Sequence, residues 1–433
     1  MDMDVFEELE RRGFIYQCTD SDGLRSILAQ KKVTFYVGFD PTASSLHVGS
    51  LIPIMAMVWL QKSGHRPIAL LGGGTAMIGD PSGKKEMRKI ISREEIVKNA
   101  QGIEKQLRKF LNLDGTAGLL LDNSKWLLNL GYIPFLRDIG RFMSVNRMLA
   151  RESARLRYES PEGLSFLEFN YACLQAYDFY VLYRDYDCIL QMGGQDQWGN
   201  ICEGIDLIGR PEILGKKAYG LTFPLLLSST GEKFGKSVGG NVWLDSSLTS
   251  PYDYYQFWRN TDDRDVMRYL MMFTQLPYEE AKRLGSLEPP MINRAKEILA
   301  FECTMALHGF ETASKVYAGA VSIFGCCDDA ERIPTTSRII EAQRMVTMEK
   351  EIPAIELERE EVEAGIEIVD LLARSGLCSS KSQARRCIQQ GGVYLDGERV
   401  KDLNMKIGFS FLEKGSLSLR VGKKLIRKIF LKK

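Results

Sequence analysis

The chain has 433 residues, 45% of them hydrophobic, which is enough for roughly two to three globular domains. Its formal net charge of +1 favours no class of partner, and no run approaches the roughly eighteen apolar residues that span a membrane. The acidic, amphipathic start is unlike a secretory signal or a transit peptide, so we expect a cytoplasmic protein.

Cysteine and histidine are not spaced as metal ligands are. The nine cysteines include no CxxC pair and are odd in number, which favours reduced thiols in a cytosolic setting. The three histidines, His47, His65 and His308, lie at no metal-ligand spacing from one another or from a cysteine. We therefore expect no metal site in the protein itself.

Residues 1–30 predict two short helices that lead into the stretch 32–50, around which we expect the chain to be organised. Apolar residues at 33, 35, 37 and 39 predict a buried strand, and the apolar segment 51–64 predicts a helix. His47 and Gly49 lie between the two, where a helix amino terminus attracts phosphate and a glycine lets a nucleoside approach the backbone. Taken alone, such a histidine is more often a hydrogen-bonded structural residue.

A second strand is predicted at 66–72, and it forms a strand–helix–strand crossover unit with the first. It ends in the glycine cluster 72–74, which fits neither the GxGxxG nor the P-loop pattern. We interpret the cluster as a close approach of the backbone to a ligand. Asp80 follows where it could hold a cation such as an α-ammonium group, although residues 80–83 also have the composition of a simple turn.

Several further segments precede the second half of the sheet. Basic residues at 84–89 form either a solvated face or a segment that covers a phosphate. The pattern at 92–111 is helical, and 118–121 is a short strand. Residues 126–160 are mostly helical and carry six arginines, so we expect an insertion that serves as a dimer surface or as a platform for RNA phosphates.

The helix predicted at 167–180 carries Tyr171, Gln175 and Asp178 at i, i+4 and i+7, so these side chains share one face. Their apolar neighbours leave no clean solvent face. Because a buried polar stripe needs polar partners, we expect a polar ligand to meet it.

A second glycine-rich turn follows the strand predicted at 187–191. In this turn, at 193–200, Asp196 is well placed to accept both hydroxyls of a ribose. A further strand at 221–227 precedes a loop with two lysines three residues apart, which make a flexible cationic clamp.

The rest of the chain predicts three parts. Apolar stripes of period 3.6 at 249–330 indicate a helical domain, and the acidic residues 341–363 are typical of a linker. Residues 368–433 predict a compact unit in which Arg385 and Arg386 lie on the exposed side of a helix. Its end carries ten Lys or Arg against two Asp or Glu, as in a solvated face or an RNA-binding tail.

In this order the motifs resemble those of bacterial tyrosyl-tRNA synthetases over essentially the whole chain. The frame from Tyr36 to Gly49 overlaps HVGS at 47–50, which looks like the HIGH signature of class I synthetases. The sequence KFGKS at 233–237 looks like their KMSKS loop. The helix with Tyr171 and the turn at 193–200 extend the resemblance.

The resemblance implies an α/β fold class and a domain order. The catalytic domain, 1–247, would have a Rossmann-like parallel sheet of the class I synthetase type with a helical insertion at about 125–165. An all-helical domain, 248–340, and a linker, 341–366, would follow. The last part, 367–433, would be a small α+β RNA-binding domain of the small-subunit ribosomal protein type.

The resemblance also implies roles for single residues. Tyr36 and Asp178 would bind the substrate phenol hydroxyl. The rest of the tyrosine would be held by Asp80, Tyr171, Gln175 and Gln197. The nucleotide would lie against Gly38, Asp40, His47, Gly49, Gly194, Asp196 and Lys236. Catalytic contacts to the phosphates would come from Thr42, His47, Lys84, Arg88, Lys233 and Lys236. Contacts to RNA would come from Lys381, Arg385 and Arg386.

The implied reaction joins L-tyrosine to tRNA(Tyr). ATP activates tyrosine as tyrosyl-adenylate with release of pyrophosphate, and the terminal adenosine of the tRNA then accepts it. Mg²⁺ would accompany the β- and γ-phosphates, and the enzyme would be a homodimer.

Two residues depart from the pattern of the family: Val37 stands where some members have Cys, and Gln195 where many have Ser. Two alternatives stay open. One is a tryptophanyl-tRNA synthetase, which the pair Tyr36 and Asp178 and the basic C-terminal unit disfavour. The other is an RNA-binding relative that has lost catalysis.

Overall fold

The computed structural model divides the chain into two compact units. It describes residues 4–81, 91–150, 155, 158–159, 163–229, 231, 234–237, 240–328, 330–344, 354–408, 411, 416–422 and 425–432, with the backbone alone at 236–237 and 354. The first unit comprises 1–235, 242–245 and 264–285. The second comprises 236–241, 246–263 and 286–433.

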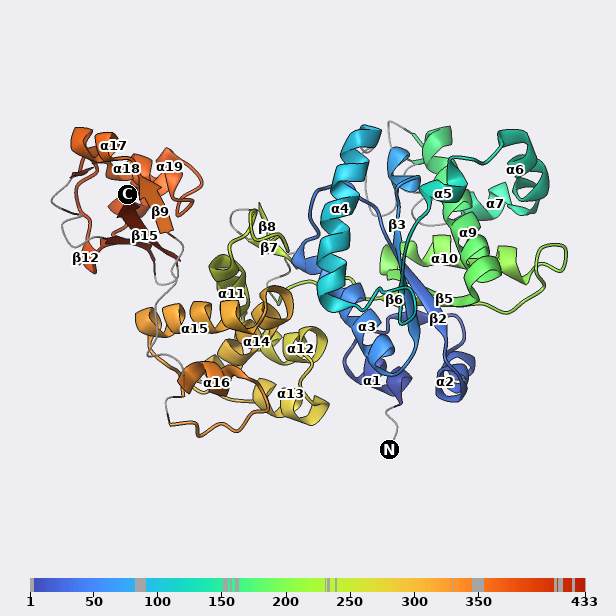
Figure 1. The fold of residues 1–433 in the computed structure, drawn as a ribbon, viewed down its shortest axis with the longest axis horizontal. Helices are drawn as coiled ribbons and strands as arrows, with labels where there is room; N and C mark the ends of the chain where they lie inside the picture. The colour runs from blue at the N-terminus through green and yellow to red at the C-terminus, as the bar shows by residue number, and fades with distance from the viewer. Residues whose placement is uncertain are drawn as a thin grey trace. The chain divides into compact units, whose positions relative to one another are not determined.

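A six-stranded sheet of order β1-β6-β5-β2-β3-β4 lies at the centre of the first unit (Figure 1). Its strands are β1 (Gln17–Cys18), β2 (Thr34–Phe39), β3 (Arg66–Leu71), β4 (Leu119–Asp122), β5 (Cys188–Gly194) and β6 (Tyr219–Phe223). Strands β2 to β6 are parallel, whereas β1 pairs with β6 as an antiparallel edge strand. The strands expected at 33–39, 66–72, 118–121 and 187–191 are confirmed. The strand expected at 221–227 ends at Phe223, because Pro224 has no N–H for the ladder.

Helices cover both faces of this sheet. They are α1 (Val5–Arg11), α2 (Ser21–Gln30), α3 (Leu51–Lys62), α4 (Arg93–Phe110), α9 (Phe166–Tyr186) and α10 (Trp198–Gly209). Figure 1 shows α3 and α4 on one side of the strands and α9 and α10 on the other. The connections β2-α3-β3 and β5-α10-β6 lead away from the middle of the sheet in opposite directions, so the strand order reverses between β2 and β5. Ligands of open α/β sheets bind outside the carboxyl ends of the strands at such a point.

The helix after β2 is buried almost all round. Nine of the twelve residues of α3 are buried, which agrees with its continuous apolar sequence. The helix ends before Gly64, whose φ of +88° suits glycine.

Short helices form the described part of the expected insertion. They are α5 (Ser124–Leu127), α6 (Tyr132–Asp138) and α7 (Val145–Leu149). Phe135, Ile139 and Met148 are buried in one cluster with Cys173 and Ala176 of α9. The insertion is therefore anchored on the helix that carries the predicted polar stripe.

Two helices from the region expected to form the helical domain group with the first unit instead. They are α12 (Asp263–Phe273) and α13 (Tyr278–Gly285). The buried Arg12 guanidinium donates to the carbonyl oxygens of Met271 at 2.9 Å and Leu276 at 2.7 Å, and pairs with Glu8. This buried cation ties α12 and the segment after it to the amino-terminal helix.

The first helices of the second unit are α11 (Pro251–Arg259), α14 (Ile292–His308), α15 (Phe310–Phe324) and α16 (Ile339–Arg344). Two short strands, β7 (Lys236–Ser237) and β8 (Gly240–Asn241), also belong to this unit. Arg294 is fully buried and donates to Glu297, the Tyr317 hydroxyl and Gln343 at 3.1, 3.0 and 2.7 Å. One buried guanidinium thus joins α14, α15 and α16.

The C-terminal part of this unit has a five-stranded sheet of order β12-β11-β14-β15-β9. Its strands are β9 (Ala354–Leu357), β11 (Val393–Leu395), β12 (Glu398–Arg399), β14 (Leu417–Val421) and β15 (Leu425–Leu431). The accompanying elements are α17 (Arg359–Ala364), β10 (Ile366–Glu367), α18 (Ile368–Arg374), α19 (Lys381–Gln389) and β13 (Lys406–Ile407). The predicted hairpin is confirmed, and Asp396 and Gly397 have the positive φ of its tight turn.

The expected linker, 341–366, is wrong for residues 354–364. Strand β9 pairs in parallel with β15, and Leu357 and Val362 are fully buried in the core of the C-terminal sheet. The predicted linker contains a four-residue strand, and the partner of this strand lies about seventy residues further along the chain. Local composition does not reveal such a long-range pairing. Across the described parts of the chain, no helix is long and apolar enough to cross a membrane.

Candidate active site

Tyr36 and Asp178 are buried polar residues beside the switch point of the sheet, and the charge of Asp178 acts on the Tyr36 hydroxyl. Tyr36 comes from β2 and Asp178 from α9, and each is only 2% exposed. The Tyr36 ring packs on Phe179 at 5.4 Å between centroids, and its hydroxyl has no hydrogen-bond partner among the described residues. Burial and the nearby Asp178 charge raise the pKa of Tyr36, so its hydroxyl stays protonated.

Two residues that the sequence did not single out hold the Asp178 carboxyl. Asn123 donates to one oxygen at 2.9 Å and the Trp126 indole donates to the other at 2.7 Å. Burial raises the pKa of Asp178 to about 7, although these two hydrogen bonds lower it. The signal that could have revealed Asn123 is its position directly after β4, at the same sheet edge as the predicted site.

A chain of hydrogen bonds leads from Asp178 to Asp40. Asn123 also donates to the Thr75 hydroxyl at 3.0 Å, and Thr75 donates to Asp40 at 2.8 Å. The Tyr171 hydroxyl donates to the other oxygen of Asp40 at 2.9 Å. The Asp40 side chain is therefore fixed by two donors from different elements.

The glycine cluster after β3 serves these side chains. A Cβ at Gly72 would overlap the Asp40 carboxylate, and one at Gly73 would overlap Asp122. The interpretation of the cluster as a close approach to a ligand is corrected, because the protein's own carboxylates take this space. Glycine is still required for lack of space at the Cβ position, but the neighbouring atoms belong to Asp40 and Asp122.

A second set of polar groups surrounds Asp80. Gln197 donates to Asp80 at 2.6 Å, and Asn200 donates to Gln175 at 3.0 Å and to Gln197 at 3.2 Å. Burial, followed by the charges of Asp40 and Asp80, raises the pKa of Tyr171. The charges of two carboxyl groups thus act on Tyr171, which favours a cation beside it.

His47 caps the short helix η1 (Val48–Ser50). Its Nδ1 accepts a hydrogen bond from the Gly49 N–H at 3.0 Å, and its ring lies edge-on to Trp243 at 6.4 Å. The interpretation of His47 as a hydrogen-bonded structural residue is therefore correct for its Nδ1 atom. Thr42 and Gly38 are exposed at the end of β2, and a Cβ at Gly38 would meet no atom within 4 Å.

The described piece of the KFGKS segment lies against the HVGS turn. A Cβ at Gly235 would be 3.0 Å from Val48, 3.3 Å from the Gly49 nitrogen and 3.7 Å from the His47 Nδ1. The Phe234 ring stacks on Phe273 at 5.0 Å, which holds this segment in place. The two resembling signatures are therefore neighbours in space at Gly235 and Gly49.

Several predicted phosphate ligands cannot be compared with the structure. Lys84, Arg88 and Lys233 lie outside the described residues, and the described part of Lys236 is its backbone in β7.

The turn after β5 carries the predicted ribose ligands. It is η4 (Gln195–Gln197), and a Cβ at Gly194 would be 2.6 Å from an Asp196 oxygen, so the carboxyl lies over this glycine. Gln197 donates to Asp196 at 3.4 Å. Among the described residues, no three or more His, Cys, Asp or Glu side chains gather in a way that could hold a metal ion.

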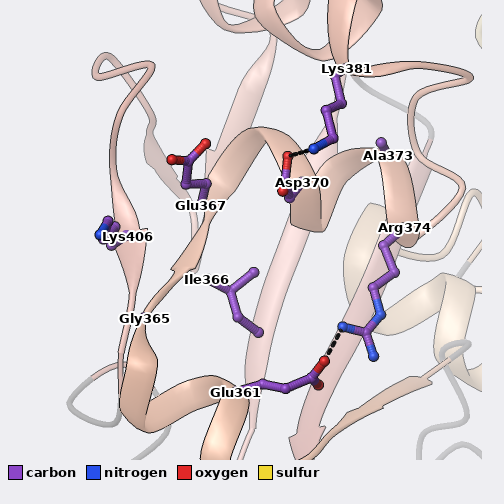
Figure 2. Close-up of a pocket in the computed structure, with 9 residues that line it drawn as sticks. All are labelled: Glu361, Gly365, Ile366, Glu367, Asp370, Ala373, Arg374, Lys381 and Lys406. Carbon is purple, nitrogen blue, oxygen red and sulfur yellow. Dashed lines mark hydrogen bonds and ion pairs between the residues drawn. The ribbon is translucent and has the colours of Figure 1, made fainter.

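The predicted RNA ligands lie on α19. Lys381, Arg385 and Arg386 are exposed there, and Lys381 pairs with Asp370 at 2.7 Å. Both residues of this pair line a cavity of about 530 Å³, and Arg374 and Glu361, which also line it, form an ion pair at 2.8 Å (Figure 2). Because these lining charges neutralise one another, we assign no ligand to the cavity.

A parallel sheet whose switch point carries buried polar side chains and two glycine-containing turns defines an α/β nucleotide-binding domain. The family described as tRNA synthetases class I (W and Y) matches residues 28–325, and the family described as S4 domain matches residues 368–410. The chain therefore belongs to the class I tRNA synthetases of the tryptophan and tyrosine type, and it carries an S4 domain. The expected fold class and class of enzyme, an ATP-dependent aminoacyl-tRNA ligase, are confirmed.

Curated relatives match the chain over its whole length. The tyrosine–tRNA ligase of Desulfosudis oleivorans is 48% identical over 433 residues, with 100% of both chains covered. That of Clostridium tetani is 44% identical over 429 residues, with 99% of both covered.

Solved structures support the same fold. A C-terminally truncated mitochondrial tyrosyl-tRNA synthetase of Aspergillus nidulans matches with a TM-score of 0.66 and 31% identity, over 74% of this chain and 94% of that one. The tyrosyl-tRNA synthetase of Archaeoglobus fulgidus in complex with L-tyrosine matches at 0.54 and 21% identity, over 72% of this chain and 100% of that one. At this identity the second match supports the fold alone.

Proposed function

We propose that the protein is a tyrosine–tRNA ligase, which activates L-tyrosine with ATP and transfers it to the terminal adenosine of tRNA(Tyr). One observation carries the choice of tyrosine. The Tyr36 hydroxyl is buried without a partner among the described residues, within electrostatic reach of an Asp178 carboxyl that Asn123 and Trp126 hold.

A phenol hydroxyl satisfies both groups at once, because it donates to the carboxylate of Asp178 and accepts from the hydroxyl of Tyr36. Phenylalanine would leave the Tyr36 hydroxyl unpaired, at a cost of about 1–3 kcal/mol, and would not make the additional hydrogen bond to Asp178. Tyrosyl-tRNA synthetases are the established example of this kind of rejection. An indole has no hydroxyl to accept from Tyr36, which disfavours tryptophan.

The other end of the substrate fits the second set of polar groups. Asp80, Tyr171 and Gln175 would hold the α-ammonium group, which the charges of Asp40 and Asp80 attract. Gln197 would lie near the carboxylate and the reacting phosphate. The substrate would then be held at both ends.

The reaction needs positioning more than acid–base chemistry. The tyrosine carboxylate is already a nucleophile, and it attacks the α-phosphorus of ATP in line while pyrophosphate leaves. Donors and cations stabilise the charge that develops on the phosphoryl oxygens. We assign this role to Thr42, His47, Lys84, Arg88, Lys233 and Lys236. Mg²⁺ would enter with the β- and γ-phosphates.

The nucleoside would lie across the two glycine-containing turns. Gly38 and Gly49 would lie against it, and Gly194 and Asp196 would bind the ribose. Asp40 is also assigned to this side, and its backbone is the available contact because Thr75 and Tyr171 occupy its carboxylate.

We further propose a catalytic part up to about residue 247, a helical part, and a C-terminal part that grips the tRNA. Lys381, Arg385 and Arg386 would contact its phosphates. The enzyme would work in the cytoplasm as a homodimer.

Amino-acid-dependent exchange of pyrophosphate into ATP tests the proposed function. We expect exchange with tyrosine and none above background with phenylalanine or tryptophan. Exchange with tryptophan would instead identify the other enzyme of the family. No exchange with any amino acid, together with tRNA binding, would identify an inactive RNA-binding relative.

Two variants separate the roles within the site. We expect Asp178→Ala to lose discrimination between tyrosine and phenylalanine first, whereas Lys233→Ala slows adenylate formation and leaves tyrosine binding nearly intact. Equilibrium binding and single-turnover kinetics measure both quantities. Equal losses of both in the two variants would refute this division of roles.

A further inference from the structure

We propose that Tyr16 and Gln195 form a bridge that holds Asp196 in position for the ribose hydroxyls of ATP, an inference that rests on the proposed function. Both are positioning residues that act through Asp196. Neither belongs to the set of residues assigned to the substrates above.

The backbone places Tyr16 at the carboxyl end of β6. Its N–H donates to the Thr222 carbonyl oxygen at 2.8 Å, and Gln17 is the register partner of Thr222 in the antiparallel pair. Tyr16 is therefore level with Phe223, and Phe223 is the register partner of Gly194 in β5. The three residues form one row across the ends of three strands.

The side chains of Tyr16 and Gln195 span the distance between the two backbones. Two strand spacings separate the backbones of Tyr16 and Gly194, roughly 10 Å, so only long side chains can span them. The Gln195 amide nitrogen donates to the Tyr16 hydroxyl at 3.1 Å. The phenol ring thus crosses the end of β6 to reach the turn after β5.

The turn that receives this bond also carries Asp196. A three-residue helix has little freedom to move one residue without the next, so a restraint on Gln195 acts on Asp196. The Asp196 carboxyl lies over Gly194 and accepts from Gln197 on its other side. The bridge fixes the exposed end of the turn, and Gln197 fixes the end that faces Asp80.

The bridge depends on the length of the Gln195 side chain. A serine hydroxyl at this position would be too short to span the distance from η4 to Tyr16. The Tyr16 side chain is 51% exposed, so it contributes little to the core. We assign its role to the hydrogen bond that its hydroxyl accepts from Gln195.

Exchange kinetics on the full-length protein test the bridge. Tyr16→Phe and Gln195→Ser each remove one partner, and we expect either change to raise the KM for ATP about two- to tenfold, as the loss of one hydrogen bond predicts. The kcat and the KM for tyrosine should stay unchanged. The double variant should lose no more than either single variant.

An ATP analogue without the 2′- and 3′-hydroxyls separates positioning of Asp196 from a general effect on structure. With this analogue we expect the native protein and both variants to have the same KM, because Asp196 has nothing to bind. The matched control is Tyr183→Phe, which removes an exposed hydroxyl bonded to the Lys217 carbonyl at 3.4 Å and should change no constant.

Several results would overturn the inference. They are an unchanged KM for ATP in both variants, the same rise with ATP and with the analogue, or additive effects in the double variant. In each of these cases the native protein still exchanges pyrophosphate with tyrosine, and the proposed function stands. A native protein without such exchange would overturn the proposed function together with the bridge.

Discussion

At the scale of single residues, the buried carboxyl of Asp178 is the central feature of the candidate site. It lies where desolvation favours the neutral acid, and only the donors Asn123 and Trp126 offset this cost. A buried carboxyl of this kind does not stabilise the fold. Its presence is explained if it accepts a hydrogen bond from a ligand hydroxyl.

The pKa of Asp178 makes stability depend on pH. It is raised to about 7 in the folded protein against 3.8 for an ordinary Asp. Between about pH 4 and pH 7 the native state keeps a proton that the unfolded chain has released, so stability falls as the pH rises through this window and levels off above it.

We therefore expect Asp178→Asn to remove this dependence. The free energy of unfolding of the variant should rise relative to that of the native protein between about pH 5 and pH 8. Urea unfolding of both proteins at both pH values, without tyrosine, measures the difference. A difference that does not change with pH would contradict the assignment.

The sequence could predict Tyr171, Gln175 and Asp178 as one group, because a helix of known period places them on one face. It could not predict Asn123 and Trp126. Their role depends on how the end of β4 packs against α9, a contact between segments some fifty residues apart. Pattern within one element carries no information on such a contact.

At the scale of elements, the glycine cluster after β3 shows how a turn creates a site. Gly72 has no side chain, and the Asp40 carboxylate occupies the space where a Cβ would be. The strand end, the turn and the carboxylate are therefore one structural unit. The local sequence predicts that glycine is needed, but only the fold reveals which atoms lie next to it.

Gly72→Ala should displace Asp40 and break its bonds to Thr75 and Tyr171. We expect a loss of about 1–3 kcal/mol in the free energy of unfolding, as for an overpacked site, together with weaker tyrosine binding. The control is Gly209→Ala at the end of α10, where a Cβ would meet only the Lys216 carbonyl at 3.9 Å. If both variants unfold at the same urea concentration, the space at Gly72 is not restricted.

The strands themselves were largely predictable, since apolar runs bounded by turn residues identify β2, β3 and β5. Their ends were less so. The end of β6 depends on Pro224, and the existence of β9 depends on β15, which lies far along the chain. Long-range pairing is the part of the fold that local pattern leaves open.

At the scale of the whole molecule, exposed apolar side chains concentrate on the insertion and on the start of α9. Eight of the sixteen large exposed hydrophobic residues in the described part of the chain fall between 128 and 167, and Ile133 and Phe166 are 70% and 68% exposed. A cluster of this kind marks a protein interface. This supports the proposed homodimer, which the resemblance to the family implies, with the helical insertion as an expected dimer surface.

Ile133→Asp combined with Phe166→Asp should shift the protein from dimer to monomer. Two charges in an apolar interface would be buried without partners, which costs several kcal/mol of association energy. Analytical ultracentrifugation over a range of concentrations measures the shift. Val97→Asp on α4, which replaces a side chain that is 52% exposed, is the control and should remain dimeric. An unchanged association constant in the double variant would place the interface elsewhere.

The four residues of β9 have a further consequence for the C-terminal sheet. They cover one side of β15, whose other side pairs with β14. Without β9, a seven-residue strand rich in Ile, Leu and Phe would present open backbone groups, the usual template for edge-to-edge aggregation. We therefore expect β9 to protect the RNA-binding domain from self-association, and local opening of this strand to be the first step by which the domain aggregates.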